Sequence, residues 1–216
     1  MTDDTKITPA MALERLLEGN ERFVAGRLTH GVGAGEARRA AVAGGQWPFA
    51  AVVACADSRV APEHIFDVGL GELFVCRNAG NLADEDVVGS LEYAAIHCSC
   101  PLLCIIGHSR CGAATAAVEV DGYAGLAETP CIASIVRGMS HAVSVVQGGD
   151  EEGVARVDAA ARANVGHQCD ELMRRSEAIS EAVAAGRIGV VGLWYDLDNG
   201  RVTRVVPMRV GVEAGV

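Results

Sequence analysis

The chain has 216 residues, of which 50% are hydrophobic and only 4% aromatic, and its formal net charge is −10. This length allows one domain with a substantial buried core, which Ala, Val, Leu and Ile must largely build. There are 18 basic against 28 acidic residues, and no Lys/Arg cluster is long enough to neutralise a row of phosphates. Nucleic acid is therefore not expected as a partner.

The start of the chain and the cysteine content bear on the compartment. Residues 1–6 are polar and acidic rather than a secretory leader, and no apolar run approaches a membrane-spanning length. We therefore expect a cytoplasmic protein with no membrane partner, in which eight cysteines favour metal binding or catalysis over disulfides. Burial as small apolar side chains is the simplest interpretation for Cys76, Cys98, Cys100, Cys104, Cys131 and Cys169.

The first element is predicted to be an amphipathic helix. Thr8 can cap its start, Pro9 suits its first turn, and apolar residues recur at helical spacing from Leu13 to Val24. Residues 27–47 are rich in glycine and lack a steady period. They are predicted to be a long surface connection that embraces a partner subunit.

Strand and helix patterns alternate along the rest of the chain. Continuous apolar runs, typical of strands covered on both faces, occupy residues 50–54, 73–75, 102–106 and 188–193. Helical patterns lie between them, and the last is predicted to be one long helix over 154–183, ended by Gly186. This alternation predicts an α/β fold whose central sheet has four mostly parallel strands flanked by helices.

The C-terminal part differs because Asn199-Gly200 is a strong hairpin signal between two short strand patterns. We therefore expect an antiparallel edge strand near residues 202–205. The whole chain, 1–216, is interpreted as a single domain. Residues 1–47 would form its N-terminal helix and arm, and residues 48–216 its α/β core.

Two motifs that carry chemistry follow two of the predicted strands. Cys-Ala-Asp-Ser-Arg occupies 55–59, and Gly-His-Ser-Arg-Cys-Gly occupies 107–112. In open α/β sheets, reactive groups gather at the carboxyl ends of strands. Side chains alternate along an extended segment, so Cys55 and Asp57 should project to one side, and Arg59 can bend back onto Asp57.

The second motif supplies an imidazole and another thiol. His108 and Cys111 are three residues apart in a turn that enters a predicted helix, which presents both side chains to one point. A helix N-terminus also favours the Cys111 thiolate. Together with Cys55 these residues make a set of three ligands that leaves the fourth tetrahedral position of zinc open, as in catalytic rather than structural sites.

The combination of these motifs resembles the β-class carbonic anhydrases, and the resemblance extends along nearly the whole chain. It includes the segments Glu18–Phe23, Gly71–Phe74, Arg77–Gly80, Ser90–Tyr93 and Trp194–Gly200. The resemblance implies Zn2+ on Cys55, His108 and Cys111, with Asp57 and Arg59 as an adjoining catalytic dyad. Asp57 is also a possible fourth ligand in a closed state of the site.

The resemblance also implies a substrate cleft at a subunit interface of a homodimer or homotetramer. The residues at the corresponding positions are Gln46, Phe74, Ala79, Tyr93 and Gly112, the last through its backbone amide. Family members regulated by bicarbonate carry a tryptophan where this chain has Val52. The arginine and tyrosine that accompany it are present as Arg77 and Tyr195, so the regulatory set is incomplete and argues against that regulation. With Gln46, the missing tryptophan makes the resemblance one to the plant-like subset, in a bacterial member.

The implied activity is the reversible hydration of carbon dioxide to bicarbonate and a proton by zinc-bound hydroxide. Two thiolate ligands should make the bound water less acidic than neutral ligands would, so activity should rise toward alkaline pH. One alternative is a zinc hydrolase acting on a linear CO2 analogue such as carbon disulfide or carbonyl sulfide. Another is a non-catalytic zinc protein or a thiol redox protein.

Several other histidines and cysteines could carry chemistry but are expected to be structural. His64 lies near the first motif and could relay protons, but a surface position is the simpler expectation. His141 and His167 are given the same interpretation. The cluster at residues 97–100 contains one histidine and two cysteines, yet it falls where a predicted helix runs into a strand, so a second metal site is not expected there.

Overall fold

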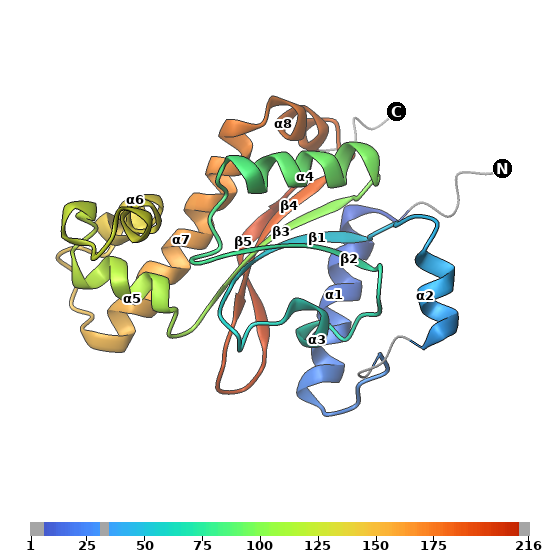
Figure 1. The fold of residues 1–216 in the computed structure, drawn as a ribbon, viewed down its shortest axis with the longest axis horizontal. Helices are drawn as coiled ribbons and strands as arrows, with labels where there is room; N and C mark the ends of the chain where they lie inside the picture. Colours follow the sequence, from blue (N-terminus) through green and yellow to red (C-terminus); the bar gives the residue numbers. More distant parts are fainter. Residues whose placement is uncertain (1–6, 31–34, 212–216) are drawn as a thin grey trace.

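The centre of the molecule is a five-stranded sheet with the strand order β2-β1-β3-β4-β5, in a computed structural model that describes residues 7–30 and 35–211. The strands are β1 (Ala50–Cys55), β2 (Leu73–Asn78), β3 (Leu102–His108), β4 (Gly189–Tyr195) and β5 (Val202–Arg209). The first four are parallel, and β5 runs antiparallel to β4 at one edge (Figure 1). The predicted fold class is confirmed.

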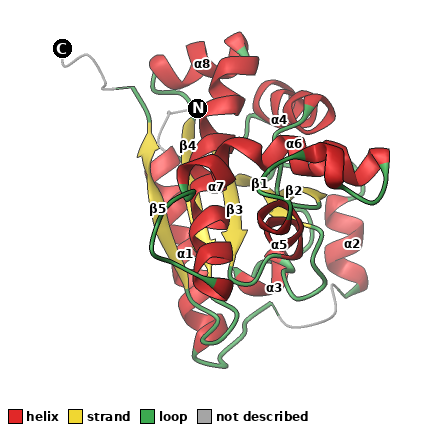
Figure 2. Ribbon diagram, turned by 90° about the vertical axis from the view of Figure 1, so that its left-hand side faces the viewer, coloured by secondary structure: helices red, strands yellow, loops and turns green. Residues whose placement is uncertain are grey.

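Helices cover both faces of this sheet. They are α1 (Pro9–Val24), α2 (Glu36–Val42), α3 (Pro62–Ile65), α4 (Glu85–His97), α5 (Gly112–Glu119), α6 (Pro130–Val145), α7 (Gly153–Arg175) and α8 (Glu177–Ala184), with a 3-10 turn at Ala124–Leu126. Helices α4, α7 and α8 pack on one face, and α1 and α3 on the other. Helices α5 and α6 pack on α7 beyond the strand ends (Figure 2).

The continuous apolar run of β1 follows from this double cover. Ala51 and Val53 face the layer of α4, α7 and α8, whereas Val52 and Ala54 face α1 and α3. All six residues of β1 are buried. A strand with two covered faces must be apolar at every position rather than at alternate ones.

Helix α1 begins and packs as the sequence predicts. The Thr8 hydroxyl accepts a hydrogen bond from the Met11 amide at 3.2 Å, and Pro9 lies in the first turn. Ala12 and Leu16, one turn apart, are fully buried against the sheet. The prediction about residues 1–6, and part of the predicted connection at residues 31–34, lie outside the described residues.

Two glycines let α7 approach the sheet closely. A Cβ on Gly107 of β3 would lie 2.5 Å from the Val165 side chain of α7. A Cβ on Gly192 of β4 would lie 2.8 Å from Val165 and 2.6 Å from Val206. Because these contacts are far shorter than van der Waals distance, a larger residue would displace α7 at Gly107, and α7 and β5 at Gly192.

The prediction of one helix over 154–183 is wrong. Ser176 ends α7 in an extended conformation, with φ −117° and ψ 105°, and its side chain accepts a hydrogen bond from the Ile179 amide at 3.1 Å to start α8. The Ser176 hydroxyl also donates to Glu92 of α4 at 2.6 Å. The apolar pattern continues across the break, which is why periodicity alone missed it. The predicted end at Gly186, φ +71°, is confirmed.

The predicted surface connection over residues 27–47 contains a helix that the sequence analysis did not predict. Helix α2 lies within this segment, and none of its residues is buried. A short helix without an apolar face gives no periodic signal, although its Ala, Arg and Glu residues favour helix. The Arg38 guanidinium ties it to the turn before β2 by donating to the Leu70 carbonyl at 2.8 Å.

The predicted hairpin and antiparallel edge are confirmed, although β5 is longer than expected. The Gly200 amide donates to the Asp196 carbonyl at 2.9 Å, and Gly200 has φ +73°, a conformation that glycine adopts without strain. The register between β4 and β5 shifts between Val190 and Leu193. Beyond this irregularity, β5 continues to Arg209, which pairs with Val190. Within the described part of the chain, no helix is long and apolar enough to cross a membrane.

Candidate metal centre

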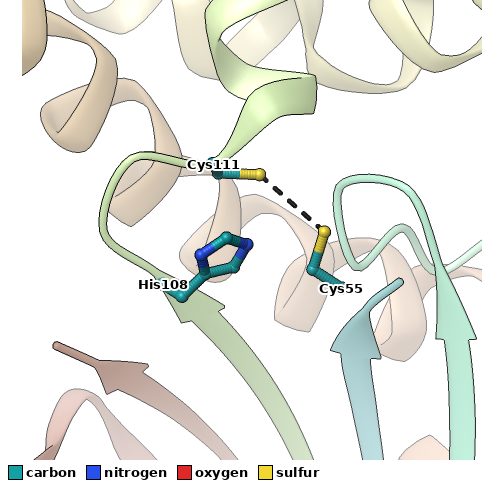
Figure 3. A group of neighbouring side chains, drawn as sticks. All are labelled: Cys55, His108 and Cys111. Atoms are coloured by element: carbon teal, nitrogen blue, oxygen red, sulfur yellow. Dashed lines mark hydrogen bonds between the residues drawn. The ribbon is translucent and has the colours of Figure 1, made fainter. Parts of the chain in front are cut away.

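Three buried side chains from separate segments converge at the carboxyl ends of β1 and β3 (Figure 3). Cys55 is the last residue of β1, His108 is the last residue of β3, and Cys111 is the N-cap residue of α5. Their ligand atoms all lie within 4.8 Å of one another, and the two sulfur atoms are 4.0 Å apart. Strands β1 and β3 are neighbours in the sheet, so the fold itself brings the two sequence motifs together.

The His108 ring is oriented for ligand binding. Its Nδ1 lies 3.0 Å from the Ser109 carbonyl oxygen, to which it donates a hydrogen bond. Its Nε2 is buried and has no hydrogen-bond partner in the described structure. A buried polar atom without a partner is costly, whereas a metal cation would satisfy it. This donor set of two thiols and one imidazole therefore fits a thiophilic divalent ion.

The two thiols are chemically unequal without a metal. A hydrogen bond from the Cys111 thiol lowers the pKa of Cys55 although burial opposes the shift, and the same contact raises the pKa of Cys111. The amide of Gly80 also donates to the Cys55 sulfur at 3.5 Å. One proton shared between two buried thiols is a state that a bound cation would displace, because both sulfurs would then bind as thiolates.

The turn between His108 and Cys111 is held from several sides. Arg110 has φ +53°, a left-handed conformation that a non-glycine residue adopts only under constraint. Its amide donates to Asp158 of α7 at 2.6 Å, and its guanidinium forms a two-point pair with Asp198 of the hairpin. The Ser109 hydroxyl accepts from the Leu197 amide at 3.0 Å. The hairpin and α7 thus fix the spacing of the two ligands.

Asp57 and Arg59 form an ion pair beside this group. The Arg59 guanidinium donates to both carboxylate oxygens, at 2.9 and 2.7 Å, and the Arg59 amide adds a hydrogen bond at 3.0 Å. These hydrogen bonds, chiefly those of the guanidinium, hold the pKa of Asp57 well below its usual value. Among the described residues, Asp57 is not part of the group of converging ligand atoms. The Asp57 carboxylate is therefore ionised and held by Arg59.

Two of the five expected cleft residues lie beside the ligand group. Asn78 pairs with Cys55 in the sheet register, so Ala79 directly follows the position opposite this ligand. Gly112 follows Cys111 at the first turn of α5 and is exposed. Both residues are therefore next to a ligand, Ala79 through the sheet register and Gly112 along the chain.

The other three expected cleft residues lie at the opposite end of the sheet. Phe74 pairs with Ala51, four residues from Cys55, which at about 3.3 Å per residue is roughly 13 Å away. The rings of Phe74 and Tyr93 are 6.4 Å apart, and Tyr93 is 50% exposed. Gln46 precedes β1 and is exposed. One chain does not bring these residues to its own ligand group.

Several residues that shape the centre were missed by the sequence argument. Arg77 donates to the carbonyls of Cys55 and Asp57, at 3.0 and 2.7 Å, and Asp158 accepts from Arg110. The sequence places Arg77 in a family segment and in the incomplete bicarbonate-regulation set but does not predict these contacts, and Asp158 lies on a helix distant in sequence from both motifs. Their partners are backbone groups, which leave no residue pattern, so only the spatial structure identifies them.

The cluster at residues 97–100 does not form a second centre. Cys98 and Cys100 are both buried, and His97 stacks near Tyr93 with ring centroids 4.9 Å apart. The Cys100 thiol donates weakly to the Leu102 carbonyl at 3.5 Å. Within residues 7–30 and 35–211, Cys55, His108 and Cys111 are the one group that converges as metal ligands do.

Comparison with known proteins agrees with the geometry. A family model described as "Carbonic anhydrase" matches residues 50–202, which include both motifs. Carbonic anhydrase 2 of Mycobacterium tuberculosis is 43% identical over 193 residues, covering 89% of this chain and 91% of that protein. The solved structure of the β-carbonic anhydrase CcaA superimposes with a TM-score of 0.73 at 25% identity, covering 90% and 92% of the two chains. The chain belongs to the β-carbonic anhydrase family.

Other β-carbonic anhydrases and relatives are similar over most of their length. A carbonic anhydrase of Mycolicibacterium smegmatis is 40% identical over 194 residues, 90% of this chain and 92% of that protein. Two tetrameric β-carbonic anhydrases from Sordaria macrospora share the fold, with a TM-score of 0.68 at 25% identity over 77% of this chain and 84% of that one. Membership makes this chain an enzyme of the carbonic anhydrase class.

Proposed function

We propose that this β-carbonic anhydrase holds zinc on Cys55, His108 and Cys111 and interconverts carbon dioxide with bicarbonate and a proton. The observation that carries the zinc assignment is the buried, unpartnered Nε2 of His108 beside two sulfurs 4.0 Å apart. Two thiolates and one imidazole are a soft, nitrogen-containing set that suits zinc, and three protein ligands leave a position for a reactant. Zinc, when bound there, would supply the nucleophile by lowering the pKa of water.

Asp57 and Arg59 would position the reactants. Arg59 keeps Asp57 ionised, so the carboxylate is an acceptor only and can orient a hydroxyl group that donates to it. Because the guanidinium donates to both carboxylate oxygens, the carboxylate is restrained from moving toward the sulfurs. We assign Asp57 to orientation and Arg59 to holding it. The closed state, with Asp57 as a fourth ligand, would require this ion pair to break first.

The substrate cleft would be built by two subunits. Ala79 and the Gly112 amide of one chain lie beside the ligand group, and Gln46, Phe74 and Tyr93 lie at the far end of the same sheet. A second copy would bring its own Gln46, Phe74 and Tyr93 to the first chain's metal. The functional unit in this proposal is a homodimer or a tetramer built from dimers, in line with the tetrameric relatives.

The cysteines support a reducing, cytoplasmic compartment for this activity. None of the eight forms a disulfide, and seven of them are buried. Burial raises the pKa of the thiols of Cys100, Cys104 and Cys169, which makes them unreactive. These residues act as small core side chains.

Stopped-flow hydration of CO2, combined with metal analysis of the purified protein, tests the proposal. We expect about one zinc per chain and a hydration rate that disappears on chelation and returns with zinc. Carbon disulfide and carbonyl sulfide serve as rival substrates in the same assay. Stoichiometric zinc without CO2 hydration would refute the proposed reaction, and a rate with only the sulfur compounds would favour the alternative hydrolase.

A further inference from the structure

The loop that follows β2 delivers a backbone hydrogen bond to a ligand sulfur. The Gly80 amide donates to the Cys55 Sγ at 3.5 Å. Gly80 has φ +84°, and a Cβ added there would lie 3.1 Å from the Met139 sulfur and 3.3 Å from the Ala113 Cβ. The backbone of Gly80 is therefore closely surrounded, and its conformation decides whether the Gly80 N–H faces the sulfur.

Two buried amide side chains on α7 hold this loop. The Asn164 Nδ2 donates to the Gly80 carbonyl at 2.9 Å, and the Gln168 Oε1 accepts from the Ala83 amide at 2.8 Å. Asn164 is 0% exposed and Gln168 3%. They are four residues apart, which places them on one face of the helix, and together they contact both ends of the segment 80–83.

The two amides also fix each other. The Gln168 Nε2 donates to the Asn164 Oδ1 at 2.9 Å and to the Gly138 carbonyl of α6 at 3.1 Å. With Oδ1 accepting, the Asn164 amide can present only its Nδ2 to Gly80, so the network determines the orientation of both groups. The loop, α6 and α7 are thereby joined through one connected set of hydrogen bonds.

Such a network is not what core packing alone would select. The neighbouring buried positions of α7 are apolar, including Ala161, Val165, Cys169 and Leu172. Burying two primary amides costs desolvation that hydrogen bonds roughly balance, and an apolar pair could fill the same space. The distinct property of the amides is the defined direction that they impose on the Gly80 carbonyl, and thereby on the conformation of the residue whose N–H faces the sulfur.

We propose that Asn164 and Gln168 are positioning residues for the metal centre, acting through the Gly80 amide on the Cys55 sulfur. This inference rests on the proposed zinc site. The Gly80 N–H fixes the direction in which the Cys55 sulfur faces the metal position, and outer-shell partners that orient a ligand in this way raise metal affinity. Loss of the hydrogen bonds from Asn164 and Gln168 should release Gly80 and weaken the bond between Cys55 and the metal.

Asn164→Asp tests this with a nearly isosteric change that removes the Nδ2 donor facing Gly80. Asn20→Asp is the matched control, since Asn20 is also buried on a helix and bridges three backbone groups, Ile65, Gly200 and Val202, at 3.2, 2.8 and 2.7 Å. Both changes should lower stability in denaturant. Zinc affinity, measured by competition with a chelator, should fall about 10–100-fold in Asn164→Asp and stay near the wild-type value in Asn20→Asp.

The cobalt-substituted protein gives a second measurement. The thiolate-to-cobalt absorption band should shift in Asn164→Asp and remain unchanged in Asn20→Asp. Equal zinc affinities and identical cobalt spectra in the two variants would overturn the inference. Should Asn164→Asp fail to fold, Gln168→Glu is judged by the same criteria, because it keeps the acceptor for Ala83 and loses both Nε2 donors. A wild-type protein that binds no zinc would instead refute the proposed function.

Discussion

The carboxylate of Asp57 is bound at two points by the guanidinium of Arg59, which lies two residues further along the chain. The same guanidinium donates to the Arg110 carbonyl at 3.2 Å, within the turn that joins His108 to Cys111. The ion pair therefore connects the first motif to the second. Its geometry depends on the fold that brings the two strand ends together, and not only on the local sequence.

Replacing Arg59 by Ala should lower the CO2 hydration rate about 100-fold while zinc remains bound, because Asp57 loses the group that orients it. Arg59→Lys should recover only part of the rate, since an ammonium cannot hold a carboxylate at two points. Stopped-flow kinetics and metal analysis measure both effects. Unchanged hydration in Arg59→Ala would show that the pair has no positioning role.

The low pKa of Asp57 makes a prediction about pH. A carboxyl group whose pKa is depressed by folding, here by Arg59, contributes stability that is present above its unfolded pKa, about 3.9, and lost as pH falls through its folded pKa. Between about pH 5 and 9 Asp57 stays ionised, so the rise in activity toward alkaline pH must come from another group. Any inflection in the hydration rate across this pH range should therefore also be present in Asp57→Asn.

The turn that carries Arg110 offers a matched pair of substitutions. Asp158→Ala removes the partly buried acceptor of the Arg110 amide and should destabilise the protein by about 1–3 kcal/mol. Asp198→Ala breaks an ion pair whose carboxylate is 72% exposed, and should cost at most about 1 kcal/mol. Urea unfolding compares the two. A larger loss in Asp198→Ala would mean that the hairpin, not α7, holds the turn.

The close packing of α7 on β3 predicts an overpacking effect. Gly107→Ala would place a methyl group 2.5 Å from the Val165 side chain and should destabilise the fold by about 1–3 kcal/mol. Val165→Ala in the same chain removes the clashing methyl groups and should relieve part of that loss. A double-mutant cycle measured by urea unfolding gives the coupling, and strictly additive effects would contradict the proposed contact.

Metal removal should lower the thermal stability of the protein. A ligand that binds only the folded state adds stability in proportion to the logarithm of its concentration over its dissociation constant, about 4 kcal/mol at a thousandfold excess. Calorimetry before and after chelation measures this difference, which Cys111→Ser should largely abolish. An identical melting temperature with and without the chelator would indicate that these side chains do not hold a metal in the folded protein.

The sequence was sufficient for the sheet and for the two motifs, because each rests on a local pattern. Continuous apolar runs identified β1 and β3, and parallel topology then placed Cys55 and His108 at one edge. The break at Ser176 escaped detection since apolar residues continue on both sides of it. Helix α2 escaped because it buries no residue.

The supporting shell of the metal centre was not accessible from sequence for a different reason. Asn164 and Asp158 act on the backbone amides and carbonyls of distant loops, and any residue type can provide those groups. Neither residue belongs to a motif with a fixed spacing to Cys55 or Cys111. Only the packing of α7 against the strand ends, closer than usual at Gly107, shows that they reach the centre.

Gln46 lies just before β1 and Cys55 is the last residue of that strand, so the two residues lie at opposite ends of the sheet. This separation has a genetic consequence if each cleft is shared by two chains. A chain carrying Asp57→Asn and a chain carrying Gln46→Ala would each assemble into inactive homodimers. A mixed dimer, however, would contain one cleft with both defects and one cleft with neither. Co-assembly of two inactive variants in equal amounts should therefore restore about a quarter of the wild-type sites, so that intact activity arises by complementation between subunits.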